Sequence, residues 1–215
     1  MPLQNRVTPE GEIIASSAKG TLMGNRGGQL HDDHKQLTSR RWASKAWISC
    51  SLEARAQRDP IMAPGHYTQL FFLDEATALA AGHRPCALCR RAEFNRFMDL
   101  WREINGLRER PKVEDVDDVL HGQRVTRARE KVVEQTALGD LPAGAMLRFE
   151  GRPMLVTAER LLVWTPERYL PAAATPEWDD PVEVLTPVAI VRLLSAGYLP
   201  ALHPSAWSAA GAKAA

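Results

Sequence analysis

The sequence predicts an α+β protein, because strand-like and helix-like patterns occupy separate stretches of its 215 residues. Residues 12–50 contain short apolar runs between tight turns, which is typical of strands. Residues 75–104 contain apolar residues at steps of three and four, which is typical of helices. Residues 145–165 return to short apolar runs that predict a small β-meander, and a C-terminal helix follows it.

The first half of the chain is expected to begin with strands. The runs GEIIASS, GTLMGN and KAWISC are separated by turns rich in Gly and Asp, and Cys50 ends the last run. The run YTQLFF is short enough to be a buried strand. Asp74 is expected to cap the helix EATALAA, which stops before Gly82, a usual residue just beyond a helix C-terminus.

A longer helix is predicted from Cys86 to about Asn105, with its apolar residues on one face. Residues 107–122 are strongly polar and contain Pro111, which predicts a linker or an exposed helical connection. We therefore expect two domains, residues 1–110 and residues 111–215.

The second half is expected to contain a short helical piece, TRAREKVVEQ, before the strands AMLRF, PMLVT and LLVWT. Thr186 is expected to cap the helix PVAIVRLLSA, with Pro187 at its first position and Gly197 just beyond its end. The ending SAAGAKAA is typical of a disordered tail.

Composition is that of a folded globular chain, with 45% hydrophobic and 25% charged residues. The formal net charge of +1 is too small to indicate a nucleic-acid partner by itself. No stretch reaches the roughly 18 apolar residues of a membrane span, and the N-terminus lacks a secretory signal pattern. We therefore expect no membrane partner and a cytoplasmic location.

The three cysteines are the strongest indication of a metal site in the sequence. Cys86 and Cys89 form a C-x-x-C pair, a spacing that places two thiolates on one metal ion. Cys50 lies at the end of a separate predicted strand, from which the fold can bring it to the same ion. Three cysteines, two of them close together, favour a Zn²⁺ site over a disulfide framework. The alternative is that all three are small buried hydrophobic residues.

The segment LFFLDEATALAAGHRPCALCRR resembles the metal-binding module of the Ada alkylation-response family, and WISCSLEAR is similar to that module's other cysteine-bearing strand end. The resemblance covers about residues 40–95. It implies a zinc module that grips the DNA phosphate backbone, with Cys50 in the place of the methyl-accepting cysteine. The chain departs from the family at Ala54, where the fourth cysteine ligand would stand.

Histidine is the expected replacement for that fourth ligand. His66 is the first choice because it lies in the connection after Cys50, and His31 is the second. His34 and His83 are further candidates. If none replaces it, three protein ligands and a water form the arrangement of catalytic zinc, which generates a hydroxide nucleophile.

Basic residues near the cysteines are expected to contact DNA phosphates, with tryptophans among them that can stack on bases. On an extended strand, Arg41 and Lys45 would face away from Trp42, so a basic face would lie over a buried tryptophan. The predicted DNA contacts are Arg40, Arg41, Lys45, Arg84, Arg90 and Arg91.

We thus expect a zinc-containing DNA-binding protein that acts in DNA damage response or processing. One alternative is a metal-dependent DNA endonuclease, in which His31 is the general base and Asp32 holds a divalent ion such as Mg²⁺. Another is a methyl-accepting DNA phosphotriester repair or sensor protein that uses Cys50. Whether the protein is an enzyme stays open between these alternatives.

Overall fold

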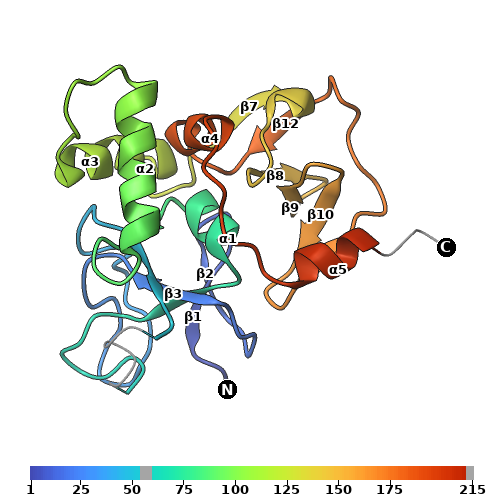
Figure 1. The fold of residues 1–215 in the computed structure, drawn as a ribbon. Coiled ribbons are helices and arrows are strands. Elements are labelled where there is room, and N and C mark those ends of the chain that lie inside the picture. Colours follow the sequence, from blue (N-terminus) through green and yellow to red (C-terminus); the bar gives the residue numbers. More distant parts are fainter. Residues whose placement is uncertain (54–59, 212–215) are drawn as a thin grey trace.

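The computed structural model describes residues 1–53 and 60–211 and confirms the α+β fold, with two six-stranded sheets in the described residues. In Figure 1 the first sheet lies at lower left and the second at right, and helix α1 lies between them. The strands of the first sheet are β1 (Gln4–Val7), β2 (Ile13–Ala15), β3 (Leu22–Asn25), β4 (Ile48–Ser51), β5 (Leu70–Phe72) and β6 (Arg84–Pro85).

The first sheet is mixed, with strand order β2-β1-β5-β3-β4-β6. Strand β4 pairs antiparallel with β3 and parallel with β6. Leu70 and Phe72 of β5 are fully buried, which fits the prediction of a buried strand from the run YTQLFF. Cys50 lies on β4, as the sequence predicts.

Helix α1 (Glu75–Ala80) begins and ends as predicted. The Asp74 carboxylate accepts a hydrogen bond of 2.9 Å from the backbone N–H of Thr77, which is the expected N-terminal cap. Gly82 follows the helix with a φ of 83°, a left-handed conformation that glycine adopts without strain. A Cβ at Gly82 would also lie 2.5 Å from the Cδ of Arg124, so glycine is required for that side chain to pass.

The second sheet contains the predicted meander, with strand order β11-β10-β9-β8-β12-β7. Its strands are β7 (Glu134–Ala137), β8 (Met146–Phe149), β9 (Arg152–Val156), β10 (Leu161–Trp164), β11 (Tyr169–Pro171) and β12 (Pro181–Val184). Helix α4 (Val188–Ser195) follows, as predicted, but the Thr186 hydroxyl does not cap it. That hydroxyl accepts a hydrogen bond of 2.9 Å from the Met146 N–H instead, which joins β8 to the start of the helix.

Three expectations about local structure are wrong, and the structure decides between the two alternatives for a fourth stretch. Helix α2 (Arg91–Ile104) begins later than Cys86, because the chain first pairs as strand β6 and then turns. Helix α3 (Val113–Arg124) occupies the stretch expected as a linker or an exposed helical connection, and its buried Val116 and Leu120 dock it. TRAREKVVEQ is not helical and leads into strand β7. Helix α5 (Ser205–Gly211) includes the first residues of the predicted tail, whose last four residues are outside the described residues.

One hydrophobic core joins the two halves of the chain. It contains Phe97 and Trp101 of α2, Leu147 and Met154 of the second sheet, and Ile190 of α4. The ranges 1–110 and 111–215, predicted as domains, therefore share a core. In Figure 1 helix α4 lies between α2 and the second sheet.

Buried polar contacts at the start of α1 also connect the halves. The Asp74 carboxylate accepts a hydrogen bond of 2.9 Å from the Tyr169 hydroxyl, and Glu75 accepts one of 2.6 Å from the Tyr198 hydroxyl. The cap of α1 is thus tied to the C-terminal part of the chain. In the part of the chain that is described, no helix combines the length and apolar character of a membrane span.

Candidate metal centre

The three cysteines lie together because β4 and β6 are parallel neighbours. Ile48 pairs with Arg84 and Ser49 with Pro85, so the next residues, Cys50 and Cys86, are adjacent. The Cys86 N–H donates a hydrogen bond of 2.9 Å to the Ser49 carbonyl, which continues the ladder to this position. The turn before α2 adds Cys89, and the three Sγ atoms all lie within 4.8 Å of one another.

The surroundings of the three thiols favour charge on Cys86. Hydrogen bonding from the Cys50 thiol, together with the backbone N–H groups of Cys89 and Leu88, lowers the pKa of Cys86 to about 4. The pKa of Cys50 is raised, because its proton is held by Cys86 and because the thiol is buried. The pKa of Cys89 is raised chiefly by burial. A bound cation would hold all three as thiolates.

This donor set fits a soft or borderline metal ion. Three sulfur ligands at this spacing are a set that Zn²⁺ accepts, and hard ions such as Mg²⁺ prefer oxygen ligands. The structure therefore supports the three-cysteine part of the predicted site. The centre could hold a metal ion between strand β4 and the turn before α2.

The predicted fourth ligands lie elsewhere in the structure. His66 is exposed, and its Nδ1 lies 3.0 Å from the Pro64 carbonyl oxygen, outside the cysteine group. His31 and His83 are buried in other contacts, and His34 is exposed in a turn. Position 54, where the Ada family has its cysteine, is outside the described residues. Among the described Cys, His, Asp and Glu residues, the group consists of the three cysteines.

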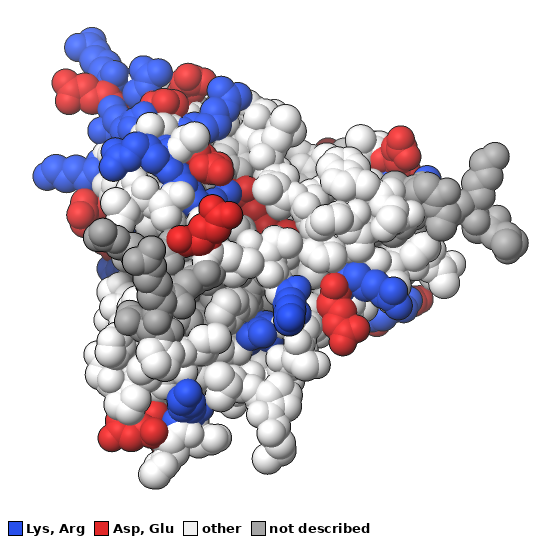
Figure 2. Space-filling view, turned by 60° about the horizontal axis from the view of Figure 1, so that its bottom comes forward, with Lys and Arg blue, Asp and Glu red and all other residues white. Residues whose placement is uncertain are grey.

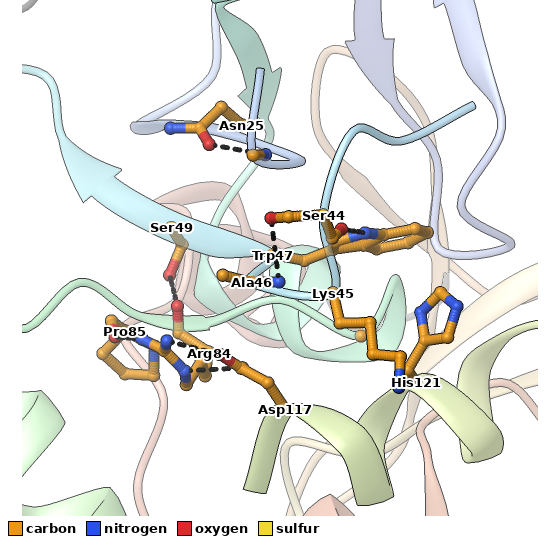
Figure 3. A network of polar contacts seen from close by, with 12 residues as sticks. Asn25, Ser44, Lys45, Ala46, Trp47, Ser49, Arg84, Pro85, Asp117 and His121 are labelled. Atoms are coloured by element: carbon orange, nitrogen blue, oxygen red, sulfur yellow. Dashed lines mark hydrogen bonds and ion pairs between the residues drawn. The ribbon is translucent and has the colours of Figure 1, made fainter. Parts of the chain in front are cut away.

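Two of the predicted DNA contacts are buried in ion pairs instead. The Arg84 guanidinium donates two hydrogen bonds of 2.8 Å to the Asp117 carboxylate on α3 (Figure 3). Arg90 lies 2.8 Å from Glu75 and donates a hydrogen bond of 3.0 Å to the Ser49 hydroxyl. These arginines hold α2 and α3 against the first sheet, so neither is placed to contact DNA.

The other predicted contacts, Arg40, Arg41, Lys45 and Arg91, are exposed. The chain between Arg40 and Ala46 forms bends and not a strand, so the expected alternation of faces is wrong. The Lys45 ammonium forms an exposed ion pair of 2.9 Å with Asp118. Trp47 is buried, and its indole N–H donates a hydrogen bond to the Ser44 carbonyl (Figure 3).

The predicted nuclease residues have structural partners. Nδ1 of buried His31 lies 2.6 Å from the Thr68 hydroxyl, and Nε2 lies 3.2 Å from the Ala63 carbonyl oxygen. The exposed Asp32 carboxylate accepts hydrogen bonds from the N–H groups of His34 and Gln36, which close a turn. These two hydrogen bonds lower the pKa of Asp32, and the bond from Gln36 has the larger effect. Both residues therefore shape the hairpin in which they lie.

A groove lined by exposed arginines lies in the segment that precedes β4. It has a volume of about 320 Å³ and is lined by Ser39, Arg40, Arg41, Trp42 and Arg129. Arg129 was not predicted, and its guanidinium donates a hydrogen bond of 3.1 Å to the Ser39 carbonyl. The segment TRARE around Arg129 is basic, but the sequence does not indicate which distant segment Arg129 contacts.

On the face drawn in Figure 2, Lys and Arg side chains gather at upper left with Asp and Glu among them. Much of that face is uncharged, so it offers no continuous basic surface. The arginine-lined groove is therefore a more specific candidate for an anion than this face.

Comparisons with family models, with curated proteins and with solved structures give no match to this chain. The resemblance of residues 40–95 to the Ada metal-binding module stays a prediction.

Proposed function

We propose that this chain is a zinc-containing protein that binds DNA through the groove of Ser39, Arg40, Arg41, Trp42 and Arg129. The groove is the observation that carries the proposal, since three arginines and one tryptophan line a single hollow. Guanidinium groups bind phosphate oxygens, and an indole stacks on an exposed base. A role in DNA damage response or processing follows only from the resemblance to Ada.

The proposed role of zinc is structural. A zinc ion on Cys50, Cys86 and Cys89 would fix strand β4 to the turn before α2. Residues 40–47 lead directly into β4, and the Trp47 carbonyl accepts a hydrogen bond of 3.1 Å from Arg84. The chain's own contacts thus connect the metal centre to the segment that lines the groove.

The groove supports DNA binding more than it supports either alternative. Both ring nitrogens of His31 have partners, which leaves no free base at the proposed nuclease residues. Cys50 is 7% exposed, which limits the access of a DNA methyl group to its sulfur.

The DNA proposal is tested by fluorescence anisotropy with a labelled oligonucleotide over a range of salt concentrations. If three phosphates are contacted, log K should fall against log salt with a slope of about −2 to −3. Arg40→Ala and Arg41→Ala should each reduce the slope by about one. Arg168→Ala, an exposed arginine on the second sheet's β10–β11 turn, is the control. Binding that is insensitive to salt would refute the proposal.

The zinc proposal is tested by metal analysis of the purified chain. One zinc ion per chain is expected, and Cys86→Ser and Cys89→Ser should lower its content strongly because each removes a thiolate ligand. Ser51→Ala, next to Cys50 on β4, is the matched control and should keep the metal. Wild-type protein that takes up no zinc after refolding with Zn²⁺ would contradict the proposal.

A further inference from the structure

A second cavity, less open than the groove, shares Arg41, Trp42 and Arg129 with it. Its volume is about 30 Å³. On the same scale, one water molecule needs roughly 10 to 15 Å³. We call it the cationic pocket, because the side chains that line its interior include Arg26, Arg124 and Lys131. The pocket is thus small, and part of its lining is shared with the groove.

The two interior arginines are almost completely buried, with Arg26 3% exposed and Arg124 1% exposed. Their guanidinium carbons lie 3.9 Å and 4.0 Å from the ring centre of Trp47, so the indole supports both. Figure 3 shows Trp47 beside Ser44 and Lys45, in the segment that follows the groove. The positions of both charges are therefore fixed by packing.

Neither arginine has an ion-pair partner among the described residues, and the same holds for Lys131. The hydrogen bonds of Arg26 go to the Gly11 carbonyl and to His83. Arg124 donates to the carbonyls of Gly82 and Lys45, and the Lys131 ammonium donates to that of Ala80. Carbonyl groups carry no formal charge, so these contacts do not neutralise the three cations.

Buried cations are costly unless an opposite charge compensates them. Nε of Arg124, a residue that lines the pocket, also lacks a hydrogen-bond partner among the described residues, and so does Nδ1 of His83, which contacts Arg26 from outside the lining. Burial, with the nearby Arg26 and Arg124 adding to it, lowers the pKa of His83 well below its ordinary value, so the imidazole is neutral. The site therefore has an excess of positive charge and an unused donor.

The charge of the lining indicates what kind of anion would compensate it. Five basic side chains, Arg26, Arg41, Arg124, Arg129 and Lys131, line the pocket together with two acidic ones, Glu10 and Glu12. With every group ionised, the formal balance is +3. A dianionic oxyanion matches this balance better than a single carboxylate. Guanidinium groups also suit the oxygen geometry of phosphate.

We propose that the cationic pocket binds a phosphate monoester group. Internal DNA phosphates are diesters with one negative charge each, whereas a monoester carries close to two at neutral pH. A DNA strand carries a monoester only at a phosphorylated end. A strand lying in the groove would therefore place its terminal phosphate in the pocket, and this extension to DNA rests on the proposed function.

Calorimetric titration with inorganic phosphate and with sulfate tests the pocket without DNA. One anion per chain is expected, and Arg26→Met should weaken its binding roughly ten- to hundredfold, because a hydrogen bond to a charged group is lost. If Arg26→Met does not fold, Lys131→Met and Arg41→Met replace it in the test, because both remove a basic side chain that lines the pocket. Arg168→Met is the control. No binding at millimolar phosphate, or binding that is unchanged in the folded variants, overturns the proposal.

A pair of oligonucleotides tests the extension to strand ends. The 5′-phosphorylated strand should bind at least about tenfold more tightly than the same strand with a 5′-hydroxyl, and Lys131→Met should abolish the difference. Two further probes distinguish this source of the phosphate from others. Adenosine monophosphate tests a free nucleotide, and a 3′-phosphorylated strand tests the opposite strand end. Equal affinity for every strand overturns the assignment to strand ends and leaves the groove in place. Failure of every strand to bind, with phosphate still bound, refutes the proposed function instead.

The pH dependence gives an independent measurement. Burial, with Arg26 and Arg124 adding to it and Glu10 opposing, lowers the pKa of Lys131 to about 7. Glu12, Arg41 and Arg129 line the same pocket. Sulfate, which stays a dianion, should bind more tightly as the pH falls from 8.5 to 6, because Lys131 gains its proton. Lys131→Met should flatten this dependence, and an unchanged dependence in that variant overturns the role of Lys131.

Discussion

Replacing Asp117 by alanine tests whether Arg84 is a structural residue. Asp117 on α3 accepts two hydrogen bonds of 2.8 Å from Arg84, and both side chains are 6% exposed. Asp117→Ala leaves the guanidinium buried without its counter-charge, which costs about 3–5 kcal/mol in the free energy of unfolding. For a chain of this size, the corresponding fall in Tm is about 6–20 °C.

The neighbouring residue provides a matched control. Asp118 lies one position further along α3 and pairs with Lys45 at 2.9 Å, but these side chains are 62% and 54% exposed. Asp118→Ala should therefore cost no more than about 1 kcal/mol. Both variants are measured by urea denaturation in the presence of Zn²⁺.

A double-mutant cycle separates the ion pair from its surroundings. Arg84→Met with Asp117→Leu removes both charges together, so the double variant should be more stable than Asp117→Leu alone. DNA affinity of the folded variants should keep its salt dependence, because Arg84 does not line the groove. A cost below about 1 kcal/mol for Asp117→Ala would refute the reasoning.

Three further predictions follow from single positions. Gly82→Ala should lower the free energy of unfolding by about 1–3 kcal/mol for the strained φ, and further because of the contact with Arg124. Gly106 has a φ of 62° and open space around it, so Gly106→Ala should cost only the strain. Urea denaturation compares the two variants. Leu155→Ala should cost about 2–5 kcal/mol in the same measurement, because Leu155 is fully buried. Without an anion, the free energy of unfolding should rise with pH between about 7 and 9, because only the unfolded chain keeps the Lys131 proton there. Lys131→Met should remove this rise, and a slope that survives the substitution in that range contradicts the shift.

Local patterns in the sequence predicted most of the elements. The cap at Asp74, the glycine after α1 and the meander of β8, β9 and β10 depend on residues close together in the chain, so spacing and turn chemistry reveal them. Helix α3 was only one of two alternatives for its stretch, because its few apolar residues stand among many charged ones, and docking against the core stabilises it.

The sequence predicted the three cysteine ligands of the candidate metal site, but it did not predict the fourth ligand. Three cysteines, two of them in a C-x-x-C pair, indicate a metal, and the strand position of Cys50 made their meeting plausible. Their proximity depends on the parallel pairing of β4 with β6, two strands separated by more than 30 residues of sequence. The histidines offered no such constraint, and His66 lies elsewhere.

The sequence by itself determined the α+β class, the main strands and helices, and the three sulfur ligands, because these depend on local periodicity and residue chemistry. Tertiary structure decided which arginines are exposed. Arg84 and Arg90 have the same chemistry as Arg40 and Arg41, but only the first two meet a buried carboxylate. It also decided that Arg26 and Arg124, 98 positions apart in the sequence, lie over one tryptophan. Whether a charge is neutralised depends on its neighbours in space, which the order of residues does not specify.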